Sequence, residues 1–167
     1  MNDAPNDPAF THLDHQGRLR MVDVSAKVES RRYARASCRV RTPLAEDALA
    51  SRLTSDEIIR ARLIGIQAAK RTSDVIPLCH PLALTHVQVD VEILADGCVV
   101  RAEVSVRGST GVEMEALSAC SFAALALMDA LGEDAQTRLS DLVVDEKSGG
   151  TSGDWGRDLG SGPTSAE

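Results

Sequence analysis

Apolar residues in this chain recur every second position in several separate segments. The alternation runs through residues 33–41, 87–93 and 100–106, where Ala, Cys, Val and Ile alternate with mostly polar residues. This pattern predicts strands that bury one face and expose the other. A last apolar segment, residues 139–146, predicts a fourth strand, and residues 95–97 (Ala-Asp-Gly) predict a hairpin turn between the second and third.

Two further segments have apolar residues at helical spacing. The first begins with Asp56 and Glu57, acidic residues that the helix dipole favours in a first turn, and runs to about Lys70. The second, residues 112–131, is rich in Ala and Leu and ends before Gly132, which suits the position after a helix. The order β-α-β-β-α-β predicts a ferredoxin-like α+β fold, an antiparallel sheet with helices on one face. We expect oligomerisation to cover the open face.

The shorter elements are less well marked. A short helical stretch is expected over residues 45–53 and a proline-bracketed loop over 74–81. The length of 167 residues favours one domain. Its expected parts are a flexible leader, a single ferredoxin-like domain and a Gly/Ser-rich tail, over residues 1–11, 12–148 and 149–167 respectively.

Composition excludes several classes of function. Aromatic residues make up only 2%, too few for the stacking platforms of single-strand nucleic acid binders. A net charge of −7 disfavours nucleic acid and membrane surfaces as partners. No apolar run approaches the length of a membrane span. The four cysteines are scattered and no signal peptide is visible, so we expect a cytoplasmic protein with reduced thiols.

The charges are unevenly distributed. Residues 18–71 carry 13 basic and 6 acidic side chains, whereas residues 72–167 carry 5 and 16. This asymmetry suits an anionic ligand flanked by carboxylates, or subunits that pack a basic face on an acidic one; two solvated faces are the alternative. Only Lys27, Lys70 and Lys147 are lysines, the cations whose proton can be exchanged.

Two segments before the second helix carry side chains suited to chemistry. Residues 20–27 are polar and apolar in turn, and an edge strand is the structural alternative. Residues 76–82 place Cys79 and His80 between two prolines, where His80 could hydrogen-bond a ligand or move a proton. A purely structural histidine is the alternative. Adjacent ligands make Cys79 and His80 a poor start for a zinc site.

The second helix carries three notable carboxylates. Glu113 and Glu115 lie in its first turn, where the dipole alone accounts for acidic residues. Asp129 lies near its C-terminal end, where the dipole disfavours a negative charge. The 14 positions between Glu115 and Asp129 place them about 21 Å apart along the axis. If both act in one small site, that site is built between two subunits.

The segments MVDVSAK, GIQAAKRT, IPLCHPL, TGVEMEAL and KSGGTSGDW resemble, in this order, motifs of the MoaC family of cyclic pyranopterin monophosphate synthases. The resemblance extends from about His12 to Trp155. It implies a ferredoxin-like subunit in a homohexamer built from dimers, with active sites at the dimer interface. It also implies conversion of 3′,8-cyclo-7,8-dihydroguanosine triphosphate to cyclic pyranopterin monophosphate, with release of pyrophosphate, in molybdenum cofactor biosynthesis.

Carried over residue by residue, the resemblance implies catalytic roles for Asp129, Lys147 and His80. Cations suit a triphosphate, while the ring chemistry needs groups that exchange protons. No resident metal or cofactor is firmly implied by the resemblance, although Mg²⁺ can accompany the pyrophosphate. The residues with implied roles in substrate binding are Leu78, Cys79, His80, Met114, Glu115, Glu113, Lys70, Arg32 and Lys27.

The chain departs from the family pattern at three positions. Thr54 and Gly132 stand where members usually carry lysine, and Ser109 stands where a basic residue is common. Arginine restores charge but cannot exchange protons as lysine does, so we expect turnover to be lowered. A catalytically impaired paralogue that binds ligand or a partner subunit is the alternative, and a ferredoxin-like regulatory module without chemistry is a third. Arginines that could restore the charge are Arg52, Arg60 and Arg107.

Overall fold

The structure, a computed structural model, describes residues 12–14, 16–132, 136–150 and 153–157. The predicted leader, residues 1–11, lies outside the described residues, as do residues 151–152 and 158–167 of the predicted tail. In chain order the elements are β1 (Ser30–Arg41), α1 (Glu46–Arg52), α2 (Ser55–Lys70), α3 (Thr72–Val75), β2 (His86–Leu94), β3 (Gly97–Gly108), α4 (Glu113–Leu131), β4 (Arg138–Ser148) and β5 (Trp155–Gly156).

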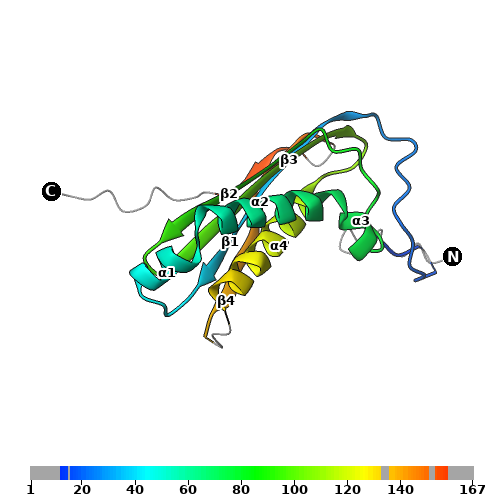
Figure 1. Ribbon diagram of the computed structural model, residues 1–167. Coiled ribbons are helices and arrows are strands. Elements are labelled where there is room, and N and C mark those ends of the chain that lie inside the picture. The colour runs from blue at the N-terminus through cyan, green and yellow to red at the C-terminus, as the bar shows by residue number, and fades with distance from the viewer. Residues whose placement is uncertain (1–11, 15, 133–135, 151–152, 158–167) are drawn as a thin grey trace.

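The strands form one antiparallel sheet in the order β2-β3-β1-β4-β5. Helices α2 and α4 cover one face of it (Figure 1). The predicted α+β ferredoxin-like fold is therefore confirmed. The predicted hairpin is present, with β2 leading directly into β3 through Ala95 and Asp96.

Three short segments differ from the expectation. The beginning of the predicted loop at residues 74–81 is the helical turn α3, because the N–H of Ile76 donates to the carbonyl of Thr72 at 2.9 Å. The edge strand considered for residues 20–27 does not form. Strand β5 was not predicted, since two residues are too few to show a periodicity.

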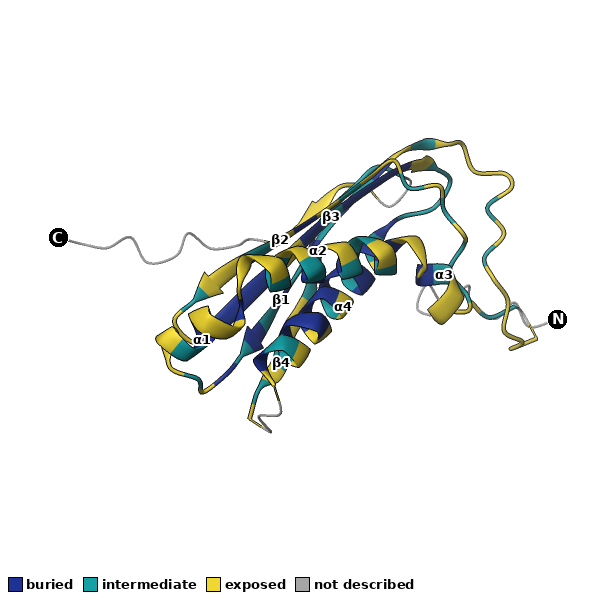
Figure 2. Ribbon diagram, viewed as in Figure 1, coloured by how far each residue is buried: buried dark blue, intermediate teal, exposed yellow. Residues whose placement is uncertain are grey.

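The core lies between the sheet and the two long helices (Figure 2). Alternate residues of β1, from Ala34 to Val40, are at most 1% exposed. Helices α2 and α4 approach closely at Gly65, where an added Cβ would lie 2.9 Å from the carbonyl oxygen of Ala119 and 3.2 Å from the Cβ of Ala123. Small side chains on both helices permit this approach, which explains how a core can form with so few aromatics.

Helix α4 is the central buried helix. By length and composition it could cross a membrane, but 56% of its apolar stretch is buried within the described part of this domain. Its two ends lie at opposite ends of the helix layer, with α3 near the N-terminal end and α1 near the C-terminal end (Figure 1). Side chains in the first and last turns of α4 therefore lie at opposite ends of the molecule.

Candidate functional site

A cleft of about 480 Å³ lies at the N-terminal end of α4. Its walls come from the irregular segment before β1, the loop between α3 and β2, the turn that precedes α4, and the end of β4. These segments are far apart in the sequence. The predicted site residues that line the cleft are Lys27, Leu78, Cys79, His80, Glu113, Met114, Glu115 and Lys147.

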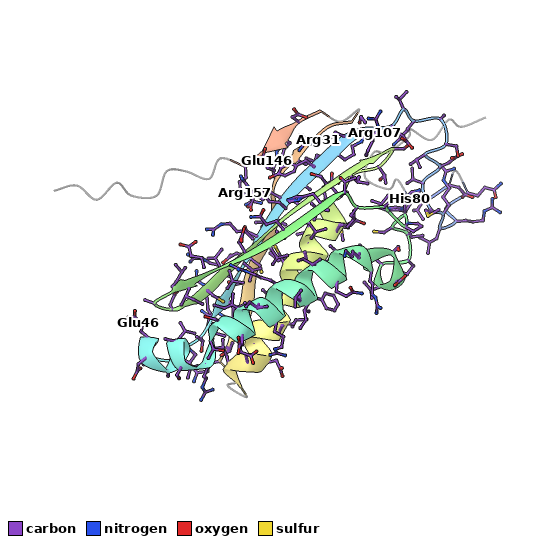
Figure 3. The ribbon with its side chains drawn as sticks, turned by 45° about the horizontal axis from the view of Figure 1, so that its top comes forward. Arg31, Glu46, His80, Arg107, Glu146 and Arg157 are labelled. Carbon is purple, nitrogen blue, oxygen red and sulfur yellow. The ribbon has the colours of Figure 1, made fainter. Side chains whose placement is uncertain are left out.

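The His80 side chain connects the loop between α3 and β2 to the segment before β1. Its Nε2 lies 2.9 Å from the carbonyl oxygen of Val22, which belongs to the segment before β1. Figure 3 shows His80 in the loop that leads into β2. A carbonyl oxygen can only accept, so Nε2 carries the proton, and in the neutral ring Nδ1 is an acceptor. The imidazole is thus fixed in orientation at the cleft. At Val22 the backbone carbonyl therefore bonds to a side chain and not to a neighbouring strand.

Glu115 is the buried acid of the cleft. Its side chain sits in the first turn of α4, and the residue is only 4% exposed. Burial, with a smaller contribution from the charge of Glu113, raises the pKa of Glu115 to about 7. Burial, and after it the charge of Glu115, also raises the pKa of the Cys79 thiol. Near neutral pH the cleft therefore holds a carboxyl group that can either donate or accept a proton.

The raised pKa of Glu115 predicts a pH-dependent stability. Between about pH 4.5 and 7 the folded chain holds a proton that the unfolded chain has released, so stability falls as pH rises through this window. Relative to Glu115→Gln, the free energy of unfolding of the wild type should drop by about 2 to 3 kcal/mol from pH 5 to pH 8. Urea unfolding of both chains at one protomer concentration measures this. If the difference in the free energy of unfolding between the wild type and Glu115→Gln does not change with pH, Glu115 is not the buried acid.

Lys147 and Glu113 form an ion pair at the mouth of the cleft. The Lys147 Nζ lies 3.2 Å from Glu113 Oε1, and each side chain is about one third exposed. The Glu113 carboxylate lies over Gly111, where any Cβ would collide with it. The glycine before α4 thus leaves room for an acid to reach across to β4.

A β-bulge determines the direction of Lys147. On β1, Ala36 pairs with Val144 but Arg35 pairs with Glu146, so Asp145 is an extra residue. Lys147 lies opposite Ala34, a fully buried residue on the helix-covered face, and residues directly opposite share a face. Without the extra residue, Lys147 would lie on the other face of the sheet. Sequence alternation alone does not reveal this.

Arg32 lies behind the cleft wall. It is 8% exposed, and its Nε and Nη2 donate to the carbonyls of Gly108 and Ser109 at 3.3 and 3.4 Å. A Cβ at Gly149 or Gly150 would collide with the backbone of Arg31 or with the Arg32 guanidinium, respectively. Arg32 therefore fixes the turn that precedes α4. Arg32 is not among the residues that line the cleft of this chain, and its predicted contact with substrate stays a prediction.

The remaining two predicted residues lie away from the cleft of this chain. Lys70 is exposed at the C-terminal end of α2. Asp129, on the last turn of α4, has a side chain that is 77% exposed and paired with Arg60 at 3.3 Å. The structure thus brings His80 and Lys147 together and leaves Asp129 at the other end of α4, as the spacing predicts.

Sequence reasoning missed several parts of the cleft. His12, Val22, Val24 and Thr110 also line it. The short motif around residues 21–27 was the available signal, whereas His12 lies in a polar stretch with no pattern. Within the described ranges, no group of three or more His, Cys, Asp or Glu residues is placed to hold a metal ion.

Comparisons with known proteins give one consistent result. Residues 21–150 match the model of the MoaC family. The cyclic pyranopterin monophosphate synthase of Streptomyces avermitilis is 44% identical over 162 residues, which cover 93% of this chain and 95% of that protein. The protein of the same name from Brucella ovis is 48% identical over 152 residues, 87% of this chain and 92% of its own length.

Proposed function

This chain belongs to the MoaC family, and we infer that it is a cyclic pyranopterin monophosphate synthase of molybdenum cofactor biosynthesis. It is thus a lyase that converts 3′,8-cyclo-7,8-dihydroguanosine triphosphate to cyclic pyranopterin monophosphate and releases pyrophosphate. One observation in the structure supports this most. Motif residues from four distant segments converge on one cleft that holds both cations and groups that exchange protons.

The reaction requires both the cations and the groups that exchange protons. When the cyclic phosphate forms, a substrate hydroxyl oxygen bonds to the innermost phosphorus and the bond to pyrophosphate breaks. The hydroxyl loses its proton, and the leaving pyrophosphate carries the negative charge. We propose that Lys27 and Lys147, which both line the cleft, stabilise that charge. We propose that His80 and Glu115, which line the same cleft, exchange protons with the ring system, a role that the raised pKa of Glu115 supports.

We propose that Asp129 completes the site from a second subunit. Its carboxylate is exposed at the end of α4 remote from the cleft, so it can serve only the cleft of another copy. Helices α2 and α4 also carry exposed apolar side chains that are available for subunit packing. They include Ile59, Leu63, Phe122 and Leu125. The proposed assembly is a homohexamer built from dimers. The predicted roles of Lys70 and Arg32 in substrate binding remain proposals in that assembly.

The two positions that lack lysine have structural roles. The hydroxyl of Thr54 accepts from the N–H of Glu57 and caps α2. Gly132 has a φ of +87°, and a Cβ there would lie 3.0 Å from Nη1 of Arg52. The cations that contact this end of α4 are Arg52 and Arg60, and arginine keeps its charge but does not exchange protons as lysine does. We propose that turnover is slower than in the two relatives named above.

The test is direct. Purified chain is supplied with the cyclised GTP intermediate, with and without Mg²⁺ and with EDTA, and pyrophosphate and pterin are quantified, with the Streptomyces avermitilis protein as the positive control. We expect slow but complete conversion. Binding without turnover would establish the impaired paralogue instead, and absence of both would overturn the assignment. The Mg²⁺ and EDTA arms decide whether a divalent ion accompanies the pyrophosphate.

The proposed compartment is the cytoplasm. All four cysteines are unpaired thiols, and three of them are buried in the core. Free thiols are characteristic of a reducing compartment. A substrate derived from GTP is consistent with the same location.

A further inference from the structure

Two arginines hold the C-terminal end of α4. Arg52, the last residue of α1, donates through Nη1 to the carbonyl of Leu131, one of the terminal carbonyls that lack a partner within the helix. Arg60, on α2, donates through Nη2 to the carbonyl of Ala126 at 3.3 Å. Both contacts join α4 to the preceding helices at the turn that carries Asp129.

The Asp129 carboxylate is held through one oxygen. Nη1 and Nη2 of Arg60 lie 3.3 and 3.4 Å from Oδ2. Among the residues that the structure describes, no side chain donates to Oδ1. A negative charge at the C-terminal end of a helix is disfavoured by the helix dipole, and Arg60 supplies the opposite charge. One oxygen is thus engaged by Arg60, while the side chain as a whole is exposed.

The Arg60 guanidinium is itself fixed in direction. Its Nε donates to Glu57 Oε2 at 2.7 Å, so the group spans two carboxylates and a main-chain carbonyl. Glu57 in turn is placed by the cap of α2, where its N–H donates to Thr54. A planar fork can meet these acceptors together, whereas the single ammonium of lysine cannot.

The ion pair between Arg60 and Asp129 adds little to the free energy of unfolding, because exposed ion pairs contribute little to stability. Side chains of Arg60 and Asp129 are 42% and 77% exposed. Besides joining α2 to α4 through the carbonyl of Ala126, the contacts of Arg60 orient one carboxylate. We propose that Arg60 is a positioning residue that directs Oδ1 of Asp129 toward a substrate bound in the cleft of another subunit. This inference rests on the proposed synthase function.

Arg62→Met is the matched control for Arg60→Met. Arg62 lies on the same helix, is equally exposed, and pairs with Asp90 at 3.8 Å, away from Asp129. We expect Arg60→Met to lower kcat by about 10²-fold, the scale of a small misplacement of a catalytic group. KM should change by less than about threefold, because the group acts in the transition state. Arg60→Lys should recover less than about a tenth of the wild-type kcat, and Arg62→Met should keep the wild-type rate.

A second measurement does not depend on activity. Carbodiimide-activated coupling of an amine to Asp129, located by mass spectrometry, should be several-fold faster in Arg60→Met than in the wild type or Arg62→Met. A wild-type kcat in Arg60→Met, or an equal loss in Arg62→Met, overturns the inference. If the wild type itself releases no pyrophosphate, the proposed function fails, and equal coupling in wild type and Arg60→Met then overturns the positioning as well. Should Arg60→Met fail to assemble, Arg60→Lys is tested by the same two measurements.

Discussion

Asp129→Asn is expected to lower kcat by about 10²- to 10⁴-fold, the contribution of a general acid or base. An amide has the size of the carboxylate but cannot accept the proton. Its oxygen can still accept from Arg60, so the end of α4 should keep its structure. Size-exclusion chromatography and circular dichroism should show an unchanged assembly, while pyrophosphate release under saturating substrate should be almost lost.

Asp141→Asn provides the control for this loss. Asp141 is also exposed, with 64% of its side chain accessible, and lies 4.0 Å from Arg41, but it belongs to β4 and does not line the cleft. We expect it to keep the wild-type rate. A normal rate in Asp129→Asn would remove Asp129 from the mechanism. It would also leave Arg60 with no carboxylate to position.

The fold could be predicted from the sequence because its strands bury one face each. The alternation of Ala34, Ala36, Cys38 and Val40 with polar residues requires a two-faced sheet, and the structure buries those residues. The same periodicity fails in β4, where Asp145 adds a residue. A bulge depends on how β4 pairs with β1, and the sequence of β4 alone does not specify that pairing. Periodicity alone therefore could not predict on which face of the sheet Lys147 lies.

The site could be predicted only in part, for a related reason. Residue types and motifs identified His80, Glu115 and Lys147, which the structure brings to one cleft. Arg32 shows the limit, since a positive charge near a triphosphate site is expected to face the ligand. In this chain it donates to the carbonyls of Gly108 and Ser109, and its contact with substrate stays a prediction. A side chain that supports a wall and one that faces a ligand can have the same sequence context.

Mixed oligomers test whether two subunits share the site. Asp129→Asn and Lys147→Met should each be nearly inactive alone, because each removes one group from every site. After dissociation and reassembly in equal amounts, half of the dimers contain one copy of each variant. In such a dimer one site loses both groups and the other keeps both, so about a quarter of the wild-type activity should return.

The matched control is a mixture of Asp129→Asn with the double variant Asp129→Asn/Lys147→Met. No pairing of these chains supplies an Asp129, so activity should stay at the level of the single variants. Recovery in the first mixture alone requires that Asp129 and Lys147 meet from different subunits. No recovery, with exchange of subunits verified by mass spectrometry, would place both groups on one chain. That result conflicts with about 21 Å of helix between Glu115, in the cleft, and Asp129, so it would require α4 to rearrange when substrate binds.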